Sequence, residues 1–181
     1  MTMRFDLSKY WSPVFIETGT RSGDSVARAL ENRFENIYSI ELSERFYEEC
    51  RFRFEDQIRE GTVELLLGSS TERLPEILNR VDVRATFWLD AHWSGPRTPT
   101  AKGDEDVPLM KELEIISRHN IHTHTILIDD VRLFGGDDRD GVDWSSVQEK
   151  SVISLLKDIN PSYRISYERG HVADDVLVAC L

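Results

Sequence analysis

The sequence predicts a single doubly wound α/β domain over residues 1–181, with a mostly parallel sheet and an antiparallel strand pair at its C-terminal edge. Short apolar runs alternate with helical periodicity along the chain, which is typical of a parallel sheet covered by helices on both faces. The run at 126–128 is apolar without alternation, as expected for a strand buried on both sides. Two further runs close the chain with no helix between them, so we expect them to pair antiparallel.

The expected strands and helices follow one another in order. Strands are expected at residues 14–17, 37–41, 63–67, 85–90, 125–129, 163–168 and 175–180. Helices are expected at residues 24–34, 46–58, 74–78, 108–116 and 147–159. The clearest is 46–58, where Phe46, Cys50, Phe54 and Ile58 recur every four residues. Ser43 precedes this helix and is its expected N-cap, because its hydroxyl can accept from a free amide of the first turn.

Composition excludes several classes of protein. Of 181 residues, 40% are hydrophobic and 30% charged, which excludes a disordered chain. The net charge of -11 disfavours binding to nucleic acids or anionic membranes. The two cysteines have no CxxC spacing, so a disulfide framework and a zinc ribbon are not expected. The N-terminus lacks the apolar region of a signal peptide and no stretch reaches the ~18 residues of a membrane span, so we expect a soluble, cytoplasmic protein.

Small or acidic residues follow each of the first five expected strands. In a doubly wound sheet, ligands bind outside the carboxyl ends of the strands, so these residues should share one edge. They are Glu17 with Gly19 and Gly23 after the first strand, Glu41 after the second, Ser69 after the third, Asp90 with His92 after the fourth, and Asp129 with Asp130 after the fifth. The combined pattern indicates a ligand site at that edge.

The first of these segments, Glu17-x-Gly19-x-x-x-Gly23, predicts a tight turn that leads into a helix. Glycine permits close approach of a ligand, and a helix N-terminus offers free amides. The spacing departs from the G-x-G-x-x-G pattern of nicotinamide enzymes, and Glu17 favours a ligand with an ammonium or sulfonium group. Glu41 lies 24 residues after Glu17, at the end of the next expected strand. A carboxylate at this position can accept hydrogen bonds from both hydroxyls of a ribose. A structural turn beside a solvent-facing acid is the alternative.

These segments resemble the class I S-adenosylmethionine-dependent methyltransferases, which have a Rossmann-like fold. The resemblance rests on residues 15–23, 38–41 and 67–70 and covers roughly residues 13–135 in order. It implies that S-adenosylmethionine is the cofactor. Its expected contacts are Glu17, Gly19, Thr20 and Gly23 at the methionine part, Glu41 at the ribose and Ser69 at the adenine.

Three aspartates, Asp90, Asp129 and Asp130, end two strands that should be neighbours about 4.8 Å apart. Three carboxylates in one corner cannot all remain ionised at low cost unless a cation or a proton joins them. An all-oxygen ligand set favours Mg²⁺ or Mn²⁺ over zinc. The alternative is that Asp130 caps the following segment and Asp90 points to water. Three histidines at 119, 122 and 124 precede the fifth strand, away from this edge, and are expected in a polar loop.

The two segments that carry these aspartates resemble segments of the cation-dependent O-methyltransferases of the catechol type, and the paired aspartates also resemble those of the macrocin type. The resemblance rests on residues 87–93 and 125–130. It implies that Asp90, Asp129 and Asp130 bind the cation, and that His92 and Trp93 line the binding site of the adenine. Ser94 stands where the catechol type has a lysine base, and Ala91 adds a residue between Asp90 and His92.

The sequence thus predicts transfer of a methyl group to a hydroxyl of a small-molecule or sugar acceptor. His92 and Lys102 are the expected catalytic bases. The alternatives are a methyltransferase without a metal and a module that binds S-adenosylmethionine or S-adenosylhomocysteine without turnover. A homodimer, in which a second subunit closes the pocket, is compatible with so short a chain.

Overall fold

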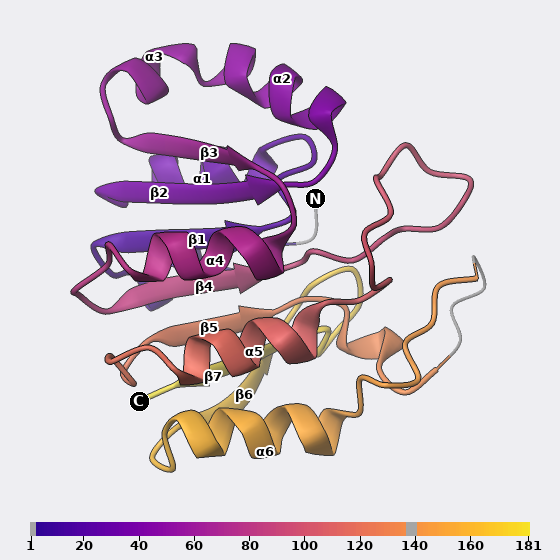
Figure 1. Cartoon of the computed structure of the whole chain (residues 1–181). Helices are drawn as coiled ribbons and strands as arrows, with labels where there is room; N and C mark the ends of the chain where they lie inside the picture. Colours follow the sequence, from indigo (N-terminus) through magenta and orange to yellow (C-terminus); the bar gives the residue numbers. More distant parts are fainter. Residues whose placement is uncertain (1–2, 137–140) are drawn as a thin grey trace.

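The structure is a computed structural model that describes residues 3–136 and 141–181. The described residues form one sheet of seven strands in the order β3-β2-β1-β4-β5-β7-β6 (Figure 1). The strands are β1 (Val14–Thr18), β2 (Asn36–Glu41), β3 (Val63–Leu67), β4 (Ala85–Leu89), β5 (Thr125–Ile128), β6 (Arg164–Glu168) and β7 (Val176–Cys180). Strands β1 to β5 are parallel, and β7 lies antiparallel between β5 and β6. The predicted fold class, with its antiparallel closing pair, is therefore confirmed.

Helices cover both faces of the sheet. The helices are α1 (Asp24–Glu31), α2 (Glu44–Arg53), α3 (Glu55–Arg59), α4 (Ser70–Leu78), α5 (Leu109–Ser117) and α6 (Glu149–Ile159), with short 3-10 helices η1 (Leu7–Tyr10) and η2 (Val131–Leu133). Apolar side chains of α4, α5 and α6 share one core with Ile126 and Ile128 of β5, in front of the sheet in Figure 1. Side chains of η1, α1 and α2 share the other core with Phe15 and Leu127. Both faces of the central strands are therefore buried, which explains their uninterrupted apolar runs.

The segment expected to form one helix at 46–58 forms two. Ser43 caps α2 as predicted, with its hydroxyl accepting from the amide of Phe46 at 3.5 Å. Phe54 leaves the helical conformation, with φ -113° and ψ 24°, and its buried ring packs where a Cβ on Gly23 would stand. The four-residue periodicity identified buried positions correctly, but it could not reveal that Phe54 turns toward Gly23 and ends α2.

His119, His122 and His124 lie in the loop between α5 and β5, as predicted, but His124 is fully buried. The amide of Ala85 donates to Nδ1 of His124 at 2.9 Å, so the proton of that ring is on Nε2. Nε2 of His124 then donates to Nδ1 of His119 at 2.8 Å, and Nε2 of His119 donates to the carbonyl of Val81 at 3.0 Å. His124 is therefore neutral in this series of hydrogen bonds. Burial lowers the pKa of His124 to about 3.

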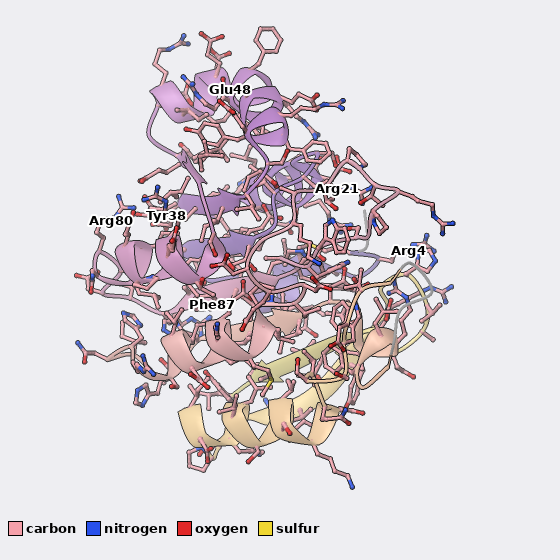
Figure 2. All side chains as sticks on the ribbon, turned by 45° about the vertical axis from the view of Figure 1, so that its right-hand side comes forward. Arg4, Arg21, Tyr38, Glu48, Arg80 and Phe87 are labelled. Carbon is pink, nitrogen blue, oxygen red and sulfur yellow. The ribbon has the colours of Figure 1, made fainter. Side chains whose placement is uncertain are left out.

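The carboxyl ends of the parallel strands point to one side, where the long segment between β4 and α5 projects from the sheet (Figure 1). Arg21, in the turn after β1, lies on this side, whereas Arg80, which follows α4, lies at the opposite end of the sheet (Figure 2). Within the described ranges, no helix combines the length and apolar character needed to cross a bilayer.

Candidate functional site

The register of the central strands brings the predicted residues to one edge. Thr18 of β1 pairs with Leu89 of β4, which in turn pairs with Ile128 of β5. The amide of Asp90 donates to the carbonyl of Thr18 at 3.1 Å, and the amide of Asp129 donates to that of Leu89 at 3.2 Å. Because the pairing continues past the strand ends, the segments after β1, β4 and β5 start side by side.

The turn after β1 depends on Gly19. Its φ of +87° lies in the left-handed region, and a Cβ there would stand 2.5 Å from the carbonyl oxygen of Asp90. Only glycine therefore allows this turn to contact the end of β4. Gly23 also has a positive φ, but its missing Cβ makes room for Phe54 rather than for a ligand. Thr20 lies between them and hydrogen bonds with the hydroxyl of Ser39 at 2.5 Å.

Glu17 lies beneath this turn and is fully buried. The hydroxyls of Ser25 and Ser39 donate to its two carboxylate oxygens, Ser39 at 2.5 Å. Burial raises the pKa of Glu17 well above its ordinary value, and Asp90 and Glu41 add to the effect. Glu17 thus ties β1 to α1 and β2, and it does not line the cavities described below.

Glu41, at the end of β2, faces the site. The amides of Arg21 and Ser43 donate to its carboxylate at 2.7 and 2.8 Å, one oxygen each. Burial raises the pKa of Glu41, while these backbone amides oppose the rise. The carboxylate is held in one orientation at the cavity wall, with acceptor capacity left over on each oxygen.

A first cavity lies over the ends of β1, β2 and β3 and contains about 950 Å³ of space, part of it open to solvent. Its wall includes Glu41, Ser69 and Trp93. Lys102 does not line it: its ammonium lies 4.3 Å from the centre of the Trp93 ring and 2.9 Å from a carboxylate oxygen of Asp106.

A second cavity, of about 1620 Å³ including open solvent, lies over α1, β4 and β5. Its wall is rich in hydroxyl and charged side chains, among them Thr20, Asp130 and His171. Five residues line both cavities: Gly19, Arg21, Asp90, His92 and Ser94. The two spaces are therefore neighbours that meet along the glycine turn and the end of β4.

An acidic cluster borders the second cavity. Asp130 belongs to two groups whose ligand atoms lie within 4.8 Å of one another, one with Asp90 and His92 and one with Asp129 and Asp175. Asp90 and Asp129 thus belong to different groups, joined by Asp130. Asp130 adopts φ +65°, a left-handed conformation that costs about 1 to 3 kcal/mol in a non-glycine residue. Such strain is common at functional sites.

The charges in this cluster influence one another. Burial raises the pKa of Asp130, and the neighbouring Asp90 raises it further, while His92 and Arg132 oppose the rise. Nδ1 of His92 lies 3.5 Å from Asp90 and 3.4 Å from Asp130. Burial opposes the charged form of His92, yet the hydrogen bond and charge of Asp90, together with the charge of Asp130, give it a raised pKa. The cluster therefore favours a proton or another cation.

Comparison with known proteins gives structural matches alone. No protein-family model matches the sequence, and no curated protein matches it at a significant level. The O-methyltransferase TomG of Streptomyces achromogenes, involved in tomaymycin synthesis and solved with S-adenosylmethionine, has 17% identity and a TM-score of 0.59, over 97% of this chain and 75% of that one. An O-methyltransferase of Bacillus cereus, solved with S-adenosylhomocysteine, has 12% identity and a TM-score of 0.57, over 96% of this chain and 76% of that one.

A Streptococcus mutans protein, also solved with S-adenosylhomocysteine, has 16% identity and a TM-score of 0.59, over 97% of this chain and 93% of that one. All three identities are low, so the shared property is the fold. The chain has the fold of the S-adenosylmethionine-dependent methyltransferases.

Within this methyltransferase fold, three residues that border the site were not predicted from the sequence. Asp175 and Arg132 contact the acidic cluster, and Trp144 packs against His92 with ring centres 5.1 Å apart. Asp175 begins the last expected strand, so its position beside β5 could have been inferred from the antiparallel pairing. Arg132 lies in the three-residue helix η2 and Trp144 in an irregular segment, and both are too short for hydrophobic periodicity to give a signal.

Proposed function

We propose that the protein is an S-adenosylmethionine-dependent methyltransferase that methylates a hydroxyl of a small-molecule or sugar acceptor with the help of a divalent cation. One observation carries the proposal: Glu41, the acid expected to bind a ribose, borders the first cavity, the acidic cluster around Asp130 borders the second, and the two cavities share a wall. A cofactor in the first cavity and an acceptor in the second would meet at that wall. The fold, shared with methyltransferases solved with this cofactor or its product, supports the same assignment.

In this proposal the adenosine part lies in the first cavity. Glu41 accepts the ribose hydroxyls with the oxygen lone pairs that the amides of Arg21 and Ser43 leave unused. Ser69 and Trp93 border the adenine. Gly19 gives the methionine part access to the backbone. Glu17 and Gly23 act indirectly, because one anchors the turn and the other admits Phe54.

The acidic cluster has the donor set of a hard cation. Asp90, Asp129 and Asp130 would hold Mg²⁺ or Mn²⁺, which prefer carboxylate oxygens. The raised pKa of Asp130 fits this role, because burial and the charge of Asp90 disfavour another negative charge there. A bound cation would lower the pKa of an acceptor hydroxyl and orient it toward the methyl group.

The two bases expected from the sequence differ in position. His92 lines both cavities and lies beside two aspartates, with a raised pKa because of its neighbouring carboxylates. Lys102 is engaged by Asp106 and the face of Trp93. We therefore propose His92 as the group that accepts the hydroxyl proton, with its role at the acidic cluster rather than beside the adenine.

Thermal unfolding with and without ligand tests the cofactor part. A ligand at 100 times its Kd adds about 2.7 kcal/mol to stability, so S-adenosylhomocysteine should raise the Tm of the wild type and NAD should not. Glu41→Gln should reduce this rise by weakening the ribose contact. Glu44→Gln, an equal charge change at an exposed position of α2, is the matched control and should keep it. A larger rise with NAD, or none with S-adenosylhomocysteine, would refute the assignment.

Calorimetric titration with Mg²⁺ tests the cation part. Asp130→Asn should weaken binding, while Asp158→Asn, an exposed carboxylate on α6, should not. Equal binding by all three proteins would remove the cation from the proposal.

Two alternatives have specific support. The ion pair between Asp130 and Arg132 favours a methyltransferase that needs no metal. The absence of a lysine at Ser94 favours a binding module without turnover. Methyl transfer to a hydroxylated acceptor with and without Mg²⁺ separates these alternatives.

A further inference from the structure

Arg132 already occupies a cation position in the acidic cluster. Its Nη1 lies 2.5 Å from a carboxylate oxygen of Asp130 and 2.5 Å from one of Asp175. The two carboxylates are nearly or fully buried, whereas the guanidinium side chain is 31% exposed. One nitrogen of Arg132 therefore bridges two buried acids from the solvent side, which is the geometry of a charge-assisted bridge.

Asp175 is fully committed within the protein. Besides Arg132, its carboxylate accepts from the amides of Arg132 at 3.2 Å, His171 at 2.9 Å and Val172 at 3.3 Å. These bonds connect η2 to the loop before β7, and the amide of Val131 adds a bond to the carbonyl of Asp175 at 3.0 Å. Asp175 has little remaining capacity to bind a metal ion, so the group of Asp129, Asp130 and Asp175 is closed by Arg132.

Asp130 is different, because both candidate ligand groups need it. One carboxylate oxygen of Asp130 contacts Arg132, and the other lies 3.4 Å from His92. A divalent cation bound through Asp130 and Asp90 would stand close to the positive guanidinium, in a site where burial weakens screening. The two cations therefore compete for the same carboxylate.

We infer that Arg132 is the resident cation of this cluster, and that a divalent ion engages Asp130 only by displacing the guanidinium. The inference rests on the proposed cation site and adds a competition to it. Arg132 is thus a positioning residue, which holds Asp130 in its left-handed conformation in the metal-free protein. The displaced side chain would move toward the second cavity, whose wall it already forms.

The test is a titration with Mn²⁺ alone, with the free ion measured by electron paramagnetic resonance at constant ionic strength. Arg132→Gln removes the charge but keeps the backbone amide that binds Asp175, and it should bind Mn²⁺ at least about tenfold more tightly than the wild type. Arg132→Lys keeps the charge and should return the Kd to within about threefold of the wild type. Arg80→Gln, which breaks a comparable two-bond pair with Glu64 far from the site, is the matched control and should equal the wild type.

A second measurement uses the wild type and does not depend on the folding of the Gln variant. The side-chain NMR resonance of Arg132 is identified as the arginine resonance that is missing from the spectrum of Arg132→Lys. In a titration of the wild type with diamagnetic Mg²⁺, this resonance should shift, and the midpoint of the shift should equal the midpoint of metal binding. Equal or weaker Mn²⁺ binding by Arg132→Gln, or an unmoved resonance, overturns the inference while leaving the cation site intact. If Arg132→Gln binds Mn²⁺ and the other proteins do not, the inference is supported and the cation has no part in the wild-type reaction. No binding by any of the proteins overturns both.

Discussion

Glu112 of α5 should make the stability of the protein depend on pH. Its side chain is 1% exposed beneath the site. Burial raises its pKa from 4.5 to about 7, although the hydroxyls of Ser70 and Thr18 oppose the rise. The folded protein therefore binds the proton of Glu112 more tightly than the unfolded chain does. The contribution of the protonated group to stability is complete below about pH 4.5 and is lost as the pH rises through about 7.

The magnitude follows from the difference between the two pKa values. A difference of about 2.5 pH units corresponds to about 3 kcal/mol, since one unit is worth about 1.4 kcal/mol. Glu112→Gln removes the ionisation and nearly preserves the shape of the side chain. The free energy of unfolding of this variant, relative to that of the wild type, should therefore increase by about 3 kcal/mol between about pH 4.5 and pH 8.

Urea unfolding at several pH values measures this difference. Glu114→Gln is the matched control, because Glu114 lies on the same helix, carries the same charge and has a 55% exposed side chain. Its unfolding free energy relative to the wild type should change by less than about 0.5 kcal/mol over the same range. If the two variants respond to pH alike, Glu112 ionises normally in the folded protein and the reasoning fails.

Three further predictions concern other parts of the fold. Gly19→Ala and Gly61→Ala both place a side chain at positive φ, but only at Gly19 would the Cβ meet backbone, at 2.5 Å. Gly19→Ala should therefore lower the Tm more than Gly61→Ala does, and it should abolish the stabilisation by S-adenosylhomocysteine. An equal decrease of Tm in the two variants would contradict the close approach at Gly19. Burial lowers the pKa of His124 to about 3, so the free energy of unfolding should fall as the pH decreases below about 6.5, by on the order of 4 kcal/mol near pH 3. In urea unfolding, His124→Asn should reduce this pH dependence, whereas the substitution His122→Asn at an exposed position should leave it unchanged. Ser43→Ala should lower the unfolding free energy by about 1 kcal/mol through loss of the helix cap, and an unchanged urea midpoint would show that the cap is not formed.

Much of the fold could be predicted because its strands have strong local signals. The apolar runs at the centre of the sheet coincide with β1 to β5, and the absence of a helix before β7 predicted the antiparallel pair. Helix ends were harder, because they depend on tertiary contacts. Phe54 breaks the helical path to pack beside Gly23, and no local pattern records that contact.

The site was predictable to the level of the sheet edge. Side chains after the strands do lie at one edge, but side-chain direction depends on the turn that follows each strand. Glu17 is directed into the protein by two serines, one of them Ser39 of the neighbouring strand. Arg132 could not be predicted because its bridge between Asp130 and Asp175 depends on the left-handed turn at Asp130.

The shared wall of the two cavities distinguishes residues that border both compartments from residues that border one. A substitution at Gly19, Asp90 or His92 alters both compartments at once. Thr98 and His171 border only the second and come from separate loops. In the proposed methyltransferase, substitutions on those loops would alter the acceptor compartment and leave the cofactor compartment unchanged.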